Sequence, residues 1–356
     1  MAEFIGFQPN DYFNSVLWTG TGVAIGSGGT AITGVGFQPD LTWIKRRENT
    51  DHNCLFDPLR GATEIIHTSS TDAETASAES LASWNSDGFV VGNLGEVNGT
   101  TQSMIAWNWK AGTTGTDLSA GTITPSASTI DTTRKFGIYK YVGNGVDGAT
   151  MAHGLGAVPN AIIIKRLDAT YDWQVGQSYL TAGNGNDWDN MIKINSNSNS
   201  DASSAYWYDT TPTSTLITLG SHDGCNGNTN TYIMYVWCDV PGMQKFGMFH
   251  GNGNANGSAI NLGFRPALLI TKRLSTSQWN MFSDTIPGYN LTPNRTFANT
   301  NAAQSTSTTN SVDFLANGFK LRGSGDETNG NQNNYIYFAW SKFPTVSSND
   351  IPGVAR

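Results

Sequence analysis

The chain has 356 residues, a length that two or three ordinary domains would fill. Charged residues make up 13% of it, while 38% are hydrophobic and 11% aromatic, and this balance excludes a chain that is mainly disordered. The net charge of -8 disfavours a basic nucleic-acid-binding face, and no apolar run reaches the roughly 18 residues that a membrane helix needs. We therefore expect neither a nucleic-acid partner nor membrane insertion.

The chain begins with a short apolar arm, residues 1–12, that contains Phe4, Ile5 and Phe7. It has no basic residue ahead of a long apolar core, so it does not predict a signal peptide. Apolar arms outside a domain stay mobile unless something holds them. We expect these three side chains to anchor the arm on a neighbouring chain. The alternative is that the arm folds back as the first strand of its own domain.

Three similar segments then recur along the chain. Pro39, Pro159 and Pro266 each stand six residues before a lysine, and mostly apolar residues fill the interval. An aromatic residue and a Gly-x-Gly turn precede each proline, a short strand-like patch follows each lysine, and an apolar strand ending in tryptophan closes each segment. The closing tryptophans are Trp107, Trp237 and Trp340. Four features in the same order, three times, predict three internal repeats.

The repeats set the expected domain boundaries. The first unit, with the arm, spans residues 1–112, the second spans 134–242, and the third, with a C-terminal tail, spans 246–356. Residues 113–133 are rich in Thr, Ser and Gly, a composition typical of an extended linker.

The local pattern is that of β-strands. Residues 162–164, 232–237 and 335–340 are short runs of β-branched and aromatic residues bounded by Gly, Asn and Pro. We predict an all-β fold of three tandem β-sandwich units of jelly-roll or lectin-like type. One stretch, 72–81, resembles a helix because alanines recur in it. The residues predicted at equivalent buried strand positions are Ile44, Ile164 and Ile270.

The sequence predicts no catalytic residue, no cofactor and no metal site, and hence not an enzyme. The histidines share no metal-ligand spacing. Cys54, Cys225 and Cys238 form neither a disulfide framework nor a CxxC pair, and they are typical of small buried thiols in a reducing cytoplasm. Carboxylates are few and no pair of them recurs among the units, which disfavours a paired-carboxylate glycosidase.

Polar loops carry the remaining candidates. Loops rich in Asn and Asp at 184–190, 221–230 and 324–334 either hold calcium through oxygen ligands or form simple turns, and both alternatives stay open. Within and after the first of these loops, an aromatic ring beside acceptors predicts contact with a glycan or with another subunit. The residues predicted for this contact are Asp187, Trp188, Asp189 and Tyr206.

Several longer runs resemble a known family. Residues 34–46, 55–61 and 106–112 are similar to marine phage virion proteins of the cyanophage type, and the later runs 153–156 and 313–321 resemble them as well. The resemblance covers nearly the whole chain, and members of the family are described as tail or fibre-like structural proteins, often with a lectin-like β-sandwich character. The present chain differs from a whole long fibre, because it has no long shaft and no heptad repeat.

The resemblance implies a virion protein that is made in the host cytoplasm. The leading interpretation is a non-enzymatic tail or fibre-like component whose β-sandwich modules attach to the host surface. The alternatives are a head decoration or head-fibre protein, and a glycan-binding or glycan-degrading virion module. The implied partners are other virion proteins, further copies of the chain with a trimer favoured, and a host surface glycan.

Overall fold

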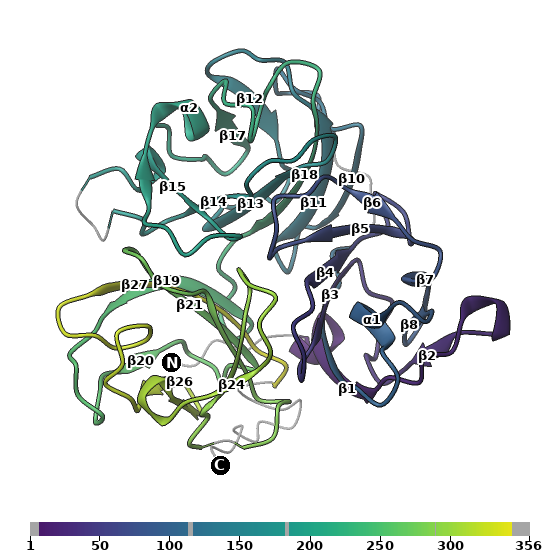
Figure 1. Cartoon of the computed structure of the whole chain (residues 1–356). Helices are drawn as coiled ribbons and strands as arrows, with labels where there is room; N and C mark the ends of the chain where they lie inside the picture. Colours follow the sequence, from purple (N-terminus) through teal and green to yellow (C-terminus); the bar gives the residue numbers. More distant parts are fainter. Residues whose placement is uncertain (1–6, 113–116, 182–184, 289, 344–356) are drawn as a thin grey trace.

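The computed structural model describes residues 7–112, 117–181, 185–288 and 290–343, and strands dominate this part of the chain (Figure 1). The prediction of an all-β fold is confirmed. No described helix is long and apolar enough to cross a membrane.

Helical structure is confined to short turns in the described ranges. The α-helices are α1 (Gly95–Asn98) and α2 (Ser204–Trp207). The helix expected at 72–81 is wrong, because strand β6 (Thr75–Ala76) forms there and pairs with β5 (Glu64–His67). A short alanine-rich stretch without caps is a marginal helix, and the neighbouring strand offers ladder hydrogen bonds instead. The 3₁₀ turns are η1 (Pro9–Asp11), η2 (Ile25–Ser27), η3 (Asp187–Asp189) and η4 (Thr308–Asn310).

The first large sheet has six strands in the order β1-β9-β3-β4-β5-β6, and each neighbouring pair is antiparallel. Its centre is β3, which begins two residues after Pro39 and pairs with β9 on one side and β4 on the other. The bounds of these strands are β1 (Phe13–Thr19), β9 (Ser103–Trp109), β3 (Leu41–Arg46) and β4 (Asn53–Phe56).

The second large sheet has seven strands in the order β10-β11-β18-β13-β14-β15-β16. Its edge strand β10 (Ala127–Asp131) lies within residues 113–133, where we expected a linker, and pairs with β11. That expectation is therefore wrong for these five residues, whose β-branched members suit a strand. The other strands are β11 (Phe136–Val142), β18 (Thr231–Trp237), β13 (Ala161–Arg166), β14 (Gln174–Gln177), β15 (Asn190–Lys193) and β16 (Asp201–Ala202).

The third large sheet has six strands in the order β19-β27-β21-β22-β23-β24. The strand after Pro266, β21, again lies at the centre between a long strand and a short one. The bounds are β19 (Gln244–His250), β27 (Asn334–Trp340), β21 (Leu268–Arg273), β22 (Asn280–Ser283), β23 (Asn294–Phe297) and β24 (Ser305–Thr306).

A small sheet accompanies each large one. Their strand orders are β2-β8-β7, β12-β17 and β20-β26-β25. The bounds are β2 (Thr30–Ile32), β8 (Gly88–Val91), β7 (Leu81–Asn85), β12 (Ala149–Ala152), β17 (Leu216–Leu219), β20 (Ala259–Asn261), β26 (Gly318–Leu321) and β25 (Val312–Leu315).

The two faces of each large sheet pack against different partners. One face contributes to a local apolar cluster shared with the small sheet, and the other contributes to a central cluster that draws on all three large sheets. Successive side chains of a strand point to opposite faces. Trp43 of β3 therefore lies in the central cluster and Ile44 in a local one, and Ile163 and Ile164 of β13 divide in the same way.

Ile270 does not share the position of Ile44 and Ile164, so that part of our prediction is wrong. Ile270 lies in the central cluster and pairs with Phe338, as Ile163 pairs with Tyr235. The residue one before the lysine in the third segment is Thr271, and it occupies the position of the other two isoleucines. A shift of one residue along a strand moves a side chain to the opposite face.

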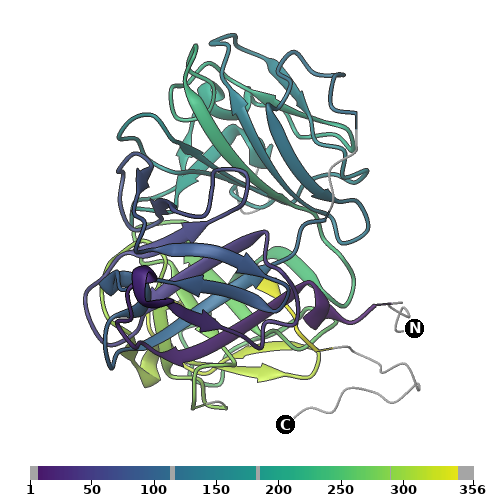
Figure 2. The same ribbon diagram turned by 90° about the vertical axis from the view of Figure 1, so that its right-hand side faces the viewer.

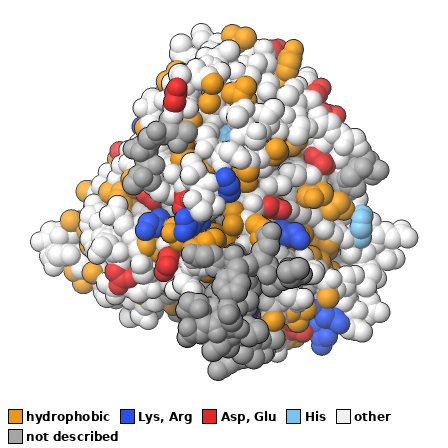
Figure 3. Space-filling view, turned by 180° about the vertical axis from the view of Figure 1, so that it is seen from behind, with side chains coloured by type: hydrophobic (Ala, Val, Ile, Leu, Met, Phe, Trp, Pro, Cys, Tyr) orange, Lys and Arg blue, Asp and Glu red, His pale blue; other side chains and the backbone are white. Residues whose placement is uncertain are grey.

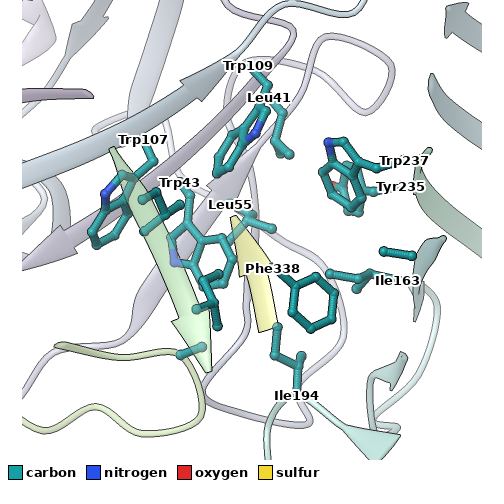
Figure 4. Packing of buried hydrophobic residues seen from close by; sticks show 14 of the residues in the cluster. Leu41, Trp43, Leu55, Trp107, Trp109, Ile163, Ile194, Tyr235, Trp237 and Phe338 are labelled. Carbon is teal, nitrogen blue, oxygen red and sulfur yellow. The ribbon is translucent and has the colours of Figure 1, made fainter. Parts of the chain in front are cut away.

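Three tryptophans meet at the centre of the molecule. Trp109, Trp237 and Trp340 are the last residues of β9, β18 and β27, and their ring centroids lie 5.3–6.4 Å apart. Figure 4 shows Trp109 and Trp237 with their neighbours from the three sheets. The strand we expected to close at Trp107 runs on to Trp109, which is the true counterpart of the other two. A void of about 20 Å³ remains among the surrounding apolar side chains.

Hydrogen bonds join the three large sheets in a closed ring. The acceptors are the backbone carbonyls of the last residues of β5, β15 and β23. The pairs, each 2.9 Å long, are Trp173 Nε1 to His67 O, Trp279 Nε1 to Lys193 O and Asn53 Nδ2 to Phe297 O. The second sheet is thus bonded to the first, the third to the second, and the first to the third.

A second ring of hydrogen bonds runs between backbones. Each backbone N–H donor lies seven residues after the end of β5, β15 or β23. Each carbonyl acceptor lies two residues after the lysine of β3, β13 or β21. The pairs are Glu74 N to Leu167 O, Ser200 N to Leu274 O and Gln304 N to Arg47 O, at 2.9, 2.9 and 2.6 Å. The described parts therefore form one body around a common core, which Figures 1 and 2 show from two directions.

Candidate functional site

A cavity of about 290 Å³ lies where loops of the first and second large sheets meet. Thr71 comes from the connection after β5, and the β13–β14 connection supplies a neighbouring wall. The hydrogen bond from Tyr171 N to Thr71 O, 2.7 Å long, closes this seam. The described lining residues are Thr71, Thr170, Tyr171, Asp172, Gln174, Lys193, Tyr206 and His222.

Aromatic rings form one wall of the cavity. The rings of Tyr206 and His222 lie 4.2 Å apart at a tilt of 42°, and Tyr171 meets His222 edge-on at 5.6 Å. Tyr206 belongs to α2, whose first turn is capped by the Ser203 hydroxyl oxygen accepting from Ala205 N. Burial raises the pKa of Tyr206 to about 12 and lowers the pKa of His222. The wall is therefore uncharged at neutral pH.

An ion pair and a buried amide supply the polar groups. Lys193 Nζ lies 2.6 Å from an Asp172 carboxylate oxygen, and both side chains are about one-third exposed. Burial acts to raise the pKa of Asp172, but hydrogen bonds from Asn195 and Lys193 outweigh it and hold that pKa below its usual value. The Gln174 amide donates to Asp172 O at 3.0 Å, while its buried Oε1 has no hydrogen-bond partner among the described residues.

This combination suits a small polyhydroxylated ligand. Aromatic faces pack against the C–H face of a sugar, and the amide and ion pair can exchange hydrogen bonds with its hydroxyl groups. Asp172 is the single carboxylate among the described lining residues, whereas glycoside hydrolysis by the usual routes needs two.

Of the four predicted contact residues, Tyr206 lines the cavity and Trp188 does not. Trp188 is only 2% exposed and packs edge-on against Trp207 at 5.4 Å, so the prediction of an exposed gripping ring is wrong. The reason lies in the neighbouring strand, where Gly176 has no side chain. A Cβ at Gly176 would stand 2.5 Å from the Trp188 ring and 2.8 Å from Trp207, so the two indoles fill the space above the glycine.

The flanking carboxylates of Trp188 have other surroundings. Asp187 accepts hydrogen bonds from the backbone and hydroxyl of Thr181, at 2.8 and 2.6 Å. Asp189 shares the 3₁₀ turn η3 with it, and the Asp189 carbonyl accepts from Ser203 N at 2.9 Å. Neither carboxylate is among the described residues that line the cavity.

The predicted anchoring arm is described only in part. Phe4 and Ile5 lie outside the described residues. Phe7 packs on its own chain, with its ring edge-on to Tyr12 at 5.7 Å and the Arg134 guanidinium 4.6 Å above it.

Buried amides of two asparagine-rich loops bind the backbone of turns that lie much earlier in the chain. Asn226 Oδ1 accepts from Asn144 N at 2.9 Å, and Asn329 Oδ1 accepts from Asn252 N at the same distance. Both amides are fully buried. These two side chains tie their loops to the Gly-x-Gly turns after β11 and β19, through Asn226 to Val146 O and Asn329 to Asn254 O as well.

The cavity residues that sequence reasoning missed come from distant parts of the chain. Tyr171 and Asp172 stand directly before Trp173, which begins the strand-like patch that follows the lysine of the second segment. His222 lies in the loop 221–230, for which the sequence predicts either calcium ligands or simple turns and no aromatic contact. One signal in the sequence could have found Tyr171 and Asp172. All three segments share the strand-like patch, but only the second has a tyrosine and an aspartate directly before it.

The chain belongs to a family described as a domain of unknown function, DUF7483, whose model matches residues 8–344. No curated protein and no solved structure matches the chain.

Proposed function

We propose that the chain consists of three repeats of one β-sandwich module, arranged as a pseudo-threefold ring. Each module pairs a large sheet with its small sheet across a local cluster. Six strands follow one order in all three large sheets, and the second sheet adds β10 at its edge. This shared order, the equal registers around β3, β13 and β21, and the two cyclic sets of hydrogen bonds support the proposal. The ring closes within a single chain, so a threefold arrangement does not require three chains.

We further propose that the protein is a non-enzymatic virion component, at a tail or fibre-like position, that attaches to a host surface glycan. The cavity at the seam of the first two modules is the observation that carries the attachment role, because it joins aromatic rings to a partly exposed ion pair, Lys193 with Asp172. On the face drawn in Figure 3, charged side chains lie among mostly uncharged groups. The virion assignment depends on the resemblance of the motifs to marine phage proteins.

Binding measurements on the cavity test the attachment role. The full chain is titrated with host envelope polysaccharide and with its component sugars by calorimetry. Tyr171→Ala removes a ring from the cavity wall, and Tyr179→Ala, a tyrosine 38% exposed outside the described lining, is the matched control. We expect binding to weaken at least about tenfold in the first variant and to be unchanged in the second. Equal affinity in both variants contradicts a role for the cavity.

Antibody labelling of purified virions tests the position. Label at the tail tip or fibres supports the proposed position, label over the capsid assigns a head decoration or head-fibre protein instead, and absence of label contradicts a virion component. Light scattering of the purified chain decides between a single-chain ring and a trimer of such rings. Release of reducing ends from the polysaccharide would contradict a non-enzymatic role.

A further inference from the structure

A cluster of metal-ligating side chains lies on the first large sheet, outside the lining of the cavity. Cys54 of β4 and His67 of β5 stand directly opposite each other in antiparallel register. Glu96 of α1 reaches both, with its Oε2 3.2 Å from His67 Nε2 and 3.5 Å from Cys54 Sγ. One ligand atom from each residue lies within 4.8 Å of the other two.

We propose that Cys54, His67 and Glu96 bind a Zn²⁺ ion. Thiolate, imidazole and carboxylate together are a zinc ligand set, and tetrahedral Zn²⁺ with bonds of about 2.0–2.3 Å holds its ligand atoms roughly 3.3–3.7 Å apart. The two separations from Glu96 Oε2, 3.2 and 3.5 Å, already match that spacing. The Cys54 and His67 ligand atoms lie within 4.8 Å of each other, so these two side chains must move together by up to about 1 Å to close the shell.

The surroundings offer a fourth ligand and a route for the ion. The His52 ring lies 4.8 Å from the His67 ring, and His52 Nδ1 is 2.9 Å from Ser69 Oγ. His52 or a water molecule completes the shell. The His67 and Glu96 side chains are 14% and 21% exposed while Cys54 is buried, so the ion reaches the site from the imidazole and carboxylate side.

The scaffold itself does not require this cluster. At the register of Cys54 and His67, the second large sheet pairs Gln174 with Lys193 and the third pairs Asn280 with Phe297. The metal-ligating chemistry is thus particular to the first sheet, although the same strands and hydrogen bonds recur in all three.

Charge balance also permits the ion. On binding, the Cys54 thiol loses its proton to solvent, His67 binds as the neutral imidazole and Glu96 is ionised. The two negative ligands then neutralise Zn²⁺ inside the protein. The Lys45 ammonium acts electrostatically on both Cys54 and Glu96 and opposes the ion, so the affinity is below that of a four-ligand structural site.

Metal titration of the full chain tests the proposal without any mutation. The chelator-treated protein is titrated with Zn²⁺ against a chromophoric chelator, and with Co²⁺ as a spectroscopic substitute. We expect one equivalent to bind, a thiolate-to-cobalt charge-transfer band, and a melting temperature that rises with Zn²⁺ concentration. Absence of stoichiometric binding, or cobalt binding without the thiolate band, overturns the proposal.

Variants then assign the ligands. Outer-shell changes at zinc sites weaken binding by about 10–100-fold, so Glu96→Gln and Cys54→Ala should weaken it at least that much. Cys225→Ala removes an equally buried cysteine, from the turn between β17 and β18, and is the matched control, with unchanged affinity expected. A charge-transfer band that survives Cys54→Ala, or disappears in Cys225→Ala, refutes the assignment. His52→Ala separates a histidine from a water as the fourth ligand.

Discussion

Trp237 lies at the junction of the three large sheets, so its truncation should weaken the whole molecule. Its ring is 3% exposed, stacks on Phe136 at 4.8 Å, and stands 6.4 and 5.8 Å from Trp109 and Trp340. Loss of a buried tryptophan to alanine costs about 3–5 kcal/mol in total, and three lost ring pairs place Trp237 toward the upper end of that range. Trp237→Ala should therefore reduce the free energy of unfolding by about 4–5 kcal/mol.

The indole nitrogen makes a finer comparison possible. Trp237 Nε1 is buried and has no hydrogen-bond partner among the described residues, so its loss removes no bond. Trp237→Phe keeps a ring in place and should cost under about half as much as the alanine variant. A larger loss in the phenylalanine variant would mean that an unseen hydrogen bond, rather than packing, holds the residue.

Denaturant unfolding followed by circular dichroism and tryptophan fluorescence measures these effects. Because the three sheets share one core, we expect a single transition that shifts as a whole. Val142→Ala, at a side chain 49% exposed on β11, is the control and should change stability by under about 0.5 kcal/mol. A loss below about 1 kcal/mol in Trp237→Ala, or an early transition of the middle part alone, would refute a shared core.

Three further predictions concern other buried groups. Trp188→Ala should cost about 3–5 kcal/mol in a thermal or denaturant melt, as for a core residue and not a surface one. Arg60→Met leaves the fully buried Asp57 without its ion partner, 2.5 Å away, and should cost about 3–5 kcal/mol, whereas adding Asp57→Asn should recover part of that loss in a double-mutant cycle. Burial lowers the pKa of Lys272 from 10.5 to about 7, so between these values the unfolded chain holds a proton that the folded chain lacks. Stability should rise with pH across that window relative to Lys272→Met, by at most about 1.4 kcal/mol per pH unit, and parallel pH profiles of the two proteins would contradict the low pKa.

Much of the strand content follows from local sequence. The spacing from Pro39, Pro159 and Pro266 to the next lysine predicts a strand at each place, and β3, β13 and β21 begin two residues after those prolines. Proline limits the residue before it to extended conformations, and β-branched and aromatic residues favour a pleated, buried surface. These are short-range effects, and they act before any distant segment arrives.

The positions of single side chains required the pairing of distant segments. Trp107 and Trp109 lie two residues apart on one face of β9, so side-chain alternation cannot tell which of them corresponds to Trp237 and Trp340. The strand pairing identifies Trp109, because it lies opposite the first residue of β3, as Trp237 and Trp340 lie opposite the first residues of β13 and β21. Trp188 has the surroundings of a surface loop in the sequence, yet the glycine at position 176 makes room for its ring.

The sequence by itself determined that this protein is built of strands, that three segments share one pattern, and that both faces of their central strands are apolar. Only the tertiary structure decided which apolar face meets the other sheets and which meets a small sheet, because alternation of side chains marks two faces without naming what covers them. The cavity beside Tyr206 and the cluster around Cys54 depend on the same long-range pairing. Their residues lie tens of positions apart, and no local preference of the chain brings them together.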